Sequence, residues 1–187
     1  MIIETLFATL SDDGEPNFAP MGVVWGEEEM TVRPFRDTIT YRNLVSTLCG
    51  VANLTDDALL FARAALEDVH PRWRPACHIK GAVLREACSW RELEVIEEEA
   101  RGDRADIRCR VVGCGSQREF LGFSRARSAV IEAAVLATRL HLHQRKDVET
   151  ALDRYGGVVS KTGGEREREA MRYLWDYVTR WYGEDTG

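Results

Sequence analysis

The sequence contains no C-x-x-C pair, and this absence excludes the simplest metal and disulfide frameworks. Its five cysteines are an odd number spread along 187 residues, so neither a zinc ribbon nor a disulfide scaffold is expected. His141 and His143 would point to different faces of a helix, and Cys77 with His78 has no second pair at ligand spacing. We therefore expect buried, reduced thiols and no metal site.

Long apolar runs and a basic leader are also missing. No apolar run approaches the ~20 residues of a membrane span. The first residues, "MIIETLFATLSDDG", lack the basic region and the small-residue cleavage site of a signal peptide. We expect a cytoplasmic protein with no membrane partner.

Positive charge is scarce. The formal net charge is −6 at pH 7; the acidic excess lies in residues 1–123, whereas residues 124–187 are nearly balanced. Nucleic-acid binders usually present a basic face, so no nucleic-acid partner is expected. Any anion that the protein binds should be small and held by local cations.

The residues that are present describe an ordinary globular protein, with 44% hydrophobic and 30% charged side chains. Short β-type segments at 2–10, 17–25 and 30–35 predict an antiparallel meander, with an Asp-Gly turn between the first two. The helical spacing after residue 38 predicts a helix to about residue 49, stopped by Gly50. Further strands are expected at 51–55 and over 78–114 with a hairpin tip at 101–103, and a helix at 56–66.

From Ser124 the hydrophobic period becomes helical. Helices are predicted over about 124–143, 146–155 and 165–182, the first of them apolar on nearly every face, as in a buried helix or one at a subunit interface. The fold class that follows is α+β, mainly β: a small antiparallel barrel in residues 1–122 with an α-helical segment in residues 123–187.

One stretch combines a strand end and a helix start with polar side chains, "VRPFRDTITYRNL". The start of a helix offers unpaired N–H groups and partial positive charge, and phosphate binds there readily. Thr38 and Thr40 can add hydroxyl donors, Arg33 and Arg36 can add cations, and Asn43 lies one turn inside. The alternative is that Thr38 only caps the helix and the arginines are solvated.

Two more stretches are candidates for ligand contact. In "NFAPMG" a proline within a strand implies an edge or a bulge, and Met21 and Gly22 could let a flat ligand approach the backbone. In "ANLTDD", Asn53 and Thr55 end a strand and could reach the polar edge of a ring system. The alternatives are a bulge that only bends the sheet, and a helix cap. The "GCG" at 113–115 lacks the rest of a dinucleotide fingerprint.

Together these stretches resemble a conserved archaeal and bacterial family of unassigned function that has an FMN-binding split β-barrel and a helical C-terminal segment. The split barrel is shared with flavin reductases, flavoredoxin and pyridoxamine-phosphate oxidases. The likeness covers nearly the whole chain, and the matching stretches are "IIET", "PNFAPMGV", "RPFRDTITYRNL", "VANLTDDALLFARAAL", "SRARSAVIEAAVLATRLHL" and "VSKTGGEREREA".

The resemblance implies where FMN would bind. The segment after the third strand would hold the FMN phosphate through some of Arg33, Arg36, Thr38, Thr40 and Asn43. The "APMG" segment would run beside the isoalloxazine ring, and "NLTDD" would lie near its pyrimidine edge. Ser124 and Ser128 stand where many relatives are expected to have Asn and His.

The expected function is therefore that of an FMN-binding protein, a flavin-dependent oxidoreductase of unknown substrate. It would work as a homodimer with flavin at the subunit interface, for which the apolar helix at Ala129–Leu142 is available. No residue resembles a dedicated acid–base catalyst, so the catalytic residues are unknown. The alternatives are a non-catalytic flavin binder or sensor, and a split barrel that holds haem, a deazaflavin or a pyridoxal-type cofactor.

Overall fold

The structure is a computed structural model, and it describes residues 1–184. The chain divides into two compact units. The barrel unit comprises Met1–Thr55 and Asp68–Phe120, and the helical unit comprises Asp56–Glu67 and the described residues from Leu121 onward. The sequence predicted that all of residues 1–122 belong to the barrel. The segment 56–67 instead groups with the helices, because its apolar residues pack into their core.

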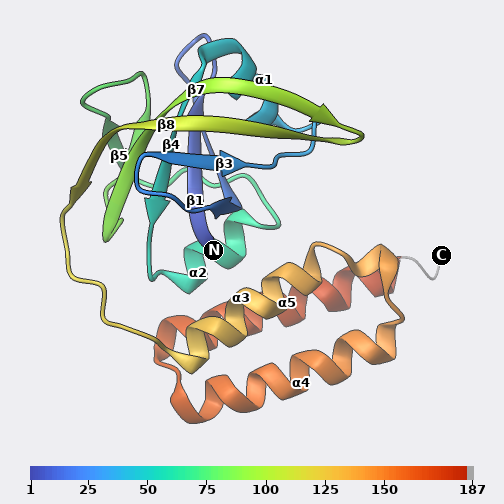
Figure 1. Cartoon of the computed structure of the whole chain (residues 1–187). Coiled ribbons are helices and arrows are strands. Elements are labelled where there is room, and N and C mark those ends of the chain that lie inside the picture. The colour runs from blue at the N-terminus through green and yellow to red at the C-terminus, as the bar shows by residue number, and fades with distance from the viewer. Residues whose placement is uncertain (185–187) are drawn as a thin grey trace. The chain divides into compact units, whose positions relative to one another are not determined.

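Six antiparallel strands close the barrel in the order β1-β2-β3-β8-β7-β4, which confirms the predicted barrel (Figure 1). Their bounds are β1 Ile2–Leu10, β2 Pro16–Val24, β3 Glu29–Val32, β4 Cys49–Leu54, β7 Ser89–Arg101 and β8 Arg104–Ser116. A separate two-stranded sheet joins β5 Trp73–Pro75 to β6 Ala82–Leu84. The predicted hairpin tip lies at Gly102, whose φ of 65° suits a glycine.

The barrel is split along β2. This strand pairs with β1 along its whole length, but it pairs with β3 only at Val24 and Thr31. In an antiparallel pair only alternate residues direct their backbone groups at the partner. Some backbone groups of β2 therefore face an open side, and Pro20, which lacks an N–H, is tolerated at this edge.

Alternating side chains of the strands fill the barrel and anchor its helix. Phe7, Met30, Leu93 and Ile107 are all essentially inaccessible in one cluster. Helix α1, Ile39–Thr47, contributes Leu44 to the same cluster. Burying a leucine contributes about 1.5–3 kcal/mol, so this contact fixes the helix, and with it the candidate phosphate site, against the barrel.

The helical unit has its own apolar core. Its elements are α2 Ala58–Ala64, α3 Arg125–Ala137, the 3-10 turn Leu140–Leu142, α4 Arg145–Thr162 and α5 Glu165–Glu184. Ala126, Ala133 and Leu140 are buried against this core. Most apolar side chains of this helix therefore pack within their own unit, as in the buried-helix alternative, and its role in a subunit interface stays a prediction.

Two predicted boundaries differ from the structure. Helix α4 continues through Gly156 and Gly157, where the sequence predicted an end, because Leu152 before the pair and Val159 after it are both buried in the core. The predicted strand beginning at residue 78 is instead a bend followed by the short β6. Within residues 1–184, no helix has the length and apolarity that crossing a membrane requires.

Candidate functional site

The first turn of α1 is organised by Thr38. This residue is the N-cap, and its Oγ1 accepts a hydrogen bond from the Tyr41 amide at 3.3 Å. The same hydroxyl donates to the carbonyl of Phe35 at 2.7 Å. Because its single hydrogen is already used, Thr38 sets the shape of the helix start but has no hydrogen left for a ligand.

Thr40 differs from Thr38 although it lies only two residues away. Its side chain is buried, and its Oγ1 accepts from Asn17 Nδ2 at 3.0 Å. One turn later Asn43, also buried, donates from Nδ2 to Thr9 Oγ1 at 3.1 Å. These two bonds tie α1 to β2 and β1 and build a polar wall under the helix.

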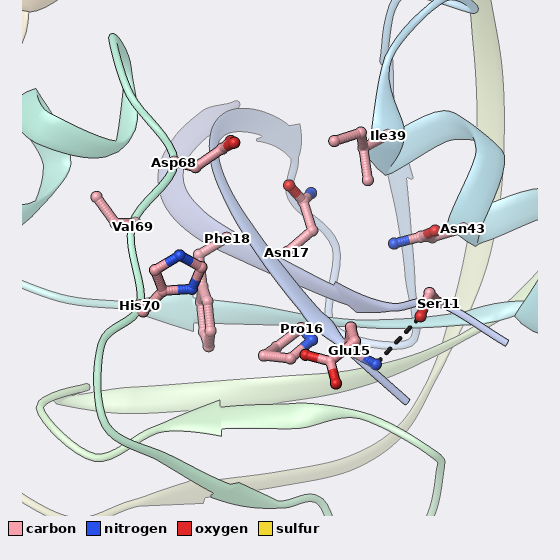
Figure 2. A pocket seen from close by; sticks show the side chains of 10 residues that line it. All are labelled: Ser11, Glu15, Pro16, Asn17, Phe18, Ile39, Asn43, Asp68, Val69 and His70. Carbon is pink, nitrogen blue, oxygen red and sulfur yellow. Dashed lines mark hydrogen bonds between the residues drawn. The ribbon is translucent and has the colours of Figure 1, made fainter. Parts of the chain in front are cut away.

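A pocket of about 200 Å³ opens beside this wall. Figure 2 shows the α1 side chains Ile39 and Asn43 on one side, the loop from Asp68 to His70 on the other, and Asn17 between them. The lining residues are Ser11, Glu15, Pro16, Asn17, Phe18, Ile39, Asn43, Asp68, Val69 and His70. Asn43 is the predicted site residue that the structure brings into this pocket, and Thr40 joins it through Asn17.

Arg33 and Arg36 lie in the junction between β3 and α1, residues 33–40, and they have different partners. Arg33 Nε forms an ion pair with Asp106 Oδ1 at 3.0 Å. Arg36 forms no ion pair with any residue of the described part of the chain, and its guanidinium lies 5.9 Å from the ring centre of Tyr41. Arg36 is thus the cation of the junction that remains available to an anion. Two carboxylates, Glu15 and Asp68, line the part of the pocket away from α1. Because they would repel an anion, an anionic group fits better on the α1 side.

Met21 and Gly22 lie on the open strand β2. The Met21 carbonyl accepts from Thr5 Oγ1 at 2.9 Å. A Cβ at Gly22 would lie 2.9 Å from Ile2 Cγ2. The protein's own neighbouring strand therefore already accounts for a glycine at this position, whatever ligand the edge accepts.

Asn53 and Thr55 are not brought to this site. Asn53 is fully buried, its Oδ1 accepts from the Leu84 amide at 2.8 Å, and its Nδ2 donates to the Ala82 carbonyl at 3.3 Å. The Thr55 hydroxyl donates to the Glu86 carbonyl at 3.5 Å. The expectation that Asn53 reaches a ring system is corrected accordingly, because both ends of its amide join β4 to β6.

Sequence reasoning missed Asn17 and the loop residue His70. Asn17 begins the "NFAPMG" stretch, in which ligand contact was predicted from the proline and the glycine and not from the asparagine. His70 lies in a segment without hydrophobic period, and its place beside β2 depends on a long-range contact. For Asn17 one sequence signal was available. It is an amide side chain near the start of a strand whose proline indicates an open edge, and such a side chain can contact a ligand there.

A second polar cluster surrounds Glu92 on β7. Its buried carboxylate accepts from the amides of Cys77 and His78, at 3.1 and 2.6 Å, and from Trp90 Nε1 at 3.2 Å. His78 Nδ1 lies 3.2 Å from the same carboxylate. Burial alone would raise the pKa of Glu92, but these hydrogen bonds outweigh it and hold the pKa below its ordinary value. Across residues 1–184 no three side chains are grouped as metal ligands.

Comparisons with known proteins agree with this architecture. Residues 3–118 match the model of a family described as protein of unknown function DUF447, N-terminal domain, and residues 124–176 match the model described as protein of unknown function DUF447. An FMN-bound protein of this family from Methanosarcina mazei is similar with a TM-score of 0.82 and 28% identity, over 94% of both chains.

More distant solved structures share the fold of the barrel. Flavoredoxin from Methanosarcina acetivorans has a TM-score of 0.57 and 13% identity, over 65% of this chain and 72% of that one. The flavin reductase component of a bacterial two-component tryptophan halogenase has a TM-score of 0.52 and 16% identity, over 63% of this chain and 82% of that one.

Proposed function

Because this chain belongs to the DUF447 family, in which a similar protein is FMN-bound, we propose that it binds FMN with the phosphate at the start of α1. We propose further that it works as a homodimeric, flavin-dependent oxidoreductase. The observation that carries the proposal is a set of hydrogen-bond donors without protein acceptors at this helix start.

The donors match a phosphate dianion in kind. The bond from Asn17 leaves the Thr40 hydroxyl hydrogen free to donate. Arg36 supplies a cation without a carboxylate partner among the described residues, and the first-turn amides of a helix have no partner inside the helix. Phosphate is stabilised by such a combination of amides, hydroxyls and guanidinium groups.

The flavin ring fits the open edge of β2. The backbone groups of this strand that face away from β1 can hydrogen-bond the polar edge of an isoalloxazine ring, and Met21 and Gly22 lie in this stretch. The pocket of about 200 Å³ is smaller than the roughly 300–1,000 Å³ of usual ligand sites. A second copy of the chain would complete the enclosure, which supports a homodimer with flavin at the interface.

The division of labour follows from these groups. When bound, FMN supplies hydride or electron transfer. The chain holds the phosphate through Thr40 and Arg36, and it orients the ring along β2. If NADH and NADPH both fail to reduce the bound flavin under anaerobic conditions, the protein is the non-catalytic flavin binder of the alternative hypothesis.

The test compares FMN with riboflavin, which lacks the phosphate. Two hydrogen bonds to a charged group contribute roughly 1.5–3 kcal/mol each, so the wild type should bind FMN about a hundredfold or more tighter, at 1.4 kcal/mol per tenfold. Thr40→Ala should weaken FMN binding about tenfold and leave riboflavin binding nearly unchanged. Flavin fluorescence quenching at fixed salt measures both affinities, and Thr40→Ser, which keeps the hydroxyl, is the matched control.

Equal affinities of the wild type for FMN and riboflavin would contradict the phosphate site. Light scattering with and without FMN tests the dimer separately. A monomer that binds FMN with full affinity at micromolar concentration would contradict a shared site while leaving the phosphate contacts in place.

A further inference from the structure

We propose that Asn17 is a positioning residue that makes the site selective for a phosphate-bearing flavin, by directing the hydroxyl hydrogen of Thr40 toward the ligand. This inference rests on the proposed FMN site. It assigns a specificity-determining role to a side chain of β2, which lies outside the helix that would hold the phosphate. It concerns one hydrogen bond, from Asn17 Nδ2 to Thr40 Oγ1 at 3.0 Å.

The chemistry of the two groups fixes the direction of this bond. The NH₂ of an asparagine can only donate, and a threonine hydroxyl has one hydrogen to give and two lone pairs to accept with. Thr40 therefore acts as the acceptor toward Asn17, and its own hydrogen must point elsewhere. Because only 3% of Thr40 is exposed, the surrounding atoms restrict rotation of the side chain.

Two other threonines of α1 and its cap use their hydroxyl hydrogen within the protein. Thr47, near the end of the same helix, donates its hydroxyl hydrogen to the Asn43 carbonyl four residues back at 2.9 Å, as threonines in helices commonly do. Thr38 donates to the Phe35 carbonyl. Within the described part of the chain, Thr40 is the one of these three threonines whose hydrogen has no backbone acceptor.

The position of Thr40 groups its remaining hydrogen with other donors. Thr40 is the second residue of α1, in the turn whose amides have no partner inside the helix. Its hydrogen and these amides thus belong to one donor group. Asn17 is held in place by its own strand, since it pairs with Thr9 across β1 and β2, and the hydroxyl of Thr9 is already the acceptor of Asn43.

The experiment measures the ratio of FMN affinity to riboflavin affinity by fluorescence quenching on the full chain at fixed salt. The proteins are the wild type, Asn17→Ala, Thr40→Ala and the double variant, together with Asn17→Asp, which keeps the side-chain shape. Asn17→Ala should lower the ratio about tenfold, as expected for one charged hydrogen bond. Asn17→Asp should lower it further, because the carboxylate would accept the Thr40 hydrogen and repel the phosphate.

The double variant separates positioning from a direct contact with the ligand. If Asn17 acts through Thr40, then Asn17→Ala should change the ratio less than about twofold once Thr40 is alanine. Additive losses in the double variant would overturn the inference, and so would an equal fall in both affinities for Asn17→Ala, which would indicate a scaffold role.

The outcomes for the two levels of the proposal are distinguishable. A wild-type ratio near one removes the phosphate site itself. A high wild-type ratio that falls in Thr40→Ala but not in either Asn17 variant leaves the phosphate site standing and removes Asn17 from it. If Asn17→Ala does not fold, as judged by circular dichroism, Asn17→Asp is compared in the wild type and in Thr40→Ala, and an equal fall in the ratio in both would overturn the positioning role.

Discussion

The barrel unit has two clusters of polar side chains that differ in how completely the protein uses them. Around Glu92, a buried carboxylate accepts from two backbone amides and an indole N–H. At the start of α1, the Thr40 hydroxyl and the Arg36 guanidinium are donors without protein acceptors among the described residues. Both clusters are rich in polar groups, so polarity alone does not distinguish them.

The difference shows how a structural polar cluster is told from a binding site. A buried polar group left without a partner costs about 1–3 kcal/mol, so a cluster inside the fold must be satisfied internally, as at Glu92. The junction borders a pocket through Ile39 and Asn43, and Arg36 is exposed, so water can satisfy an exposed donor there until a ligand replaces it. A surplus of donors is tolerated there, and it is this surplus that identifies the site.

The largest effect is expected at the satisfied cluster. In Glu92→Gln one carboxylate oxygen becomes an NH₂ group, which faces N–H donors instead of accepting from them. Losing a charged acceptor for two or more donors should lower the free energy of unfolding by about 2–4 kcal/mol. Urea denaturation followed by tryptophan fluorescence measures the change. FMN selectivity over riboflavin should not change, because the cluster belongs to the fold and not to the ligand.

The lowered pKa of Glu92 also predicts how the stability of the protein depends on pH. Because the folded pKa of Glu92 lies below the ordinary 4.5, the ionised carboxylate stabilises the fold above that ordinary value. This stabilisation is lost as the pH falls through the folded pKa. The melting temperature of Glu92→Gln should therefore vary less between neutral and acidic pH than that of the wild type. Identical pH profiles would show that Glu92 does not have this role.

An intermediate effect is expected from the two arginines of the junction. Arg36→Ala should weaken FMN binding about tenfold, by losing one hydrogen bond to a charged group. Arg33→Ala, the matched control three residues earlier, should leave FMN binding within about twofold, because Arg33 is paired with Asp106 at the surface and such pairs contribute little. Fluorescence quenching at two salt concentrations measures both. Equal losses of FMN affinity in the two variants would mean that both arginines contribute to binding and that the ion pair with Asp106 does not make Arg33 unavailable.

These pairs also show what the sequence could and could not predict. The barrel, its hairpin tip at Gly102 and the start of α1 follow from local turn, strand and capping signals, and all three were predicted. Arg33 and Arg36 look equivalent in the sequence, and only Asp106, which is distant in the chain, distinguishes them.

The two asparagines teach the same lesson. Asn43 lines the pocket, whereas both the amide nitrogen and the amide oxygen of Asn53 are hydrogen-bonded to the backbone of β6. Each residue type matched the chemistry of a flavin site equally well, so local pattern gave no reason to prefer either. Which side chains retain free hydrogen-bonding capacity is decided by long-range contacts, which spacing along the chain does not encode.

The smallest effect separates the two threonines of the helix start. Thr38→Ala removes an N-cap, which should lower the free energy of unfolding by about 1 kcal/mol, because the Tyr41 amide loses its acceptor. The ratio of FMN to riboflavin affinity should change less than about twofold, since the Thr38 hydrogen is already held by the Phe35 carbonyl. Denaturation and fluorescence quenching on Thr38→Ala and Thr40→Ala test whether Thr38 acts on stability and Thr40 on FMN selectivity. A large loss of selectivity in Thr38→Ala would show that FMN displaces the Phe35 carbonyl from the Thr38 hydroxyl, and the donors of the junction would then have to be assigned to Thr38 in place of Thr40.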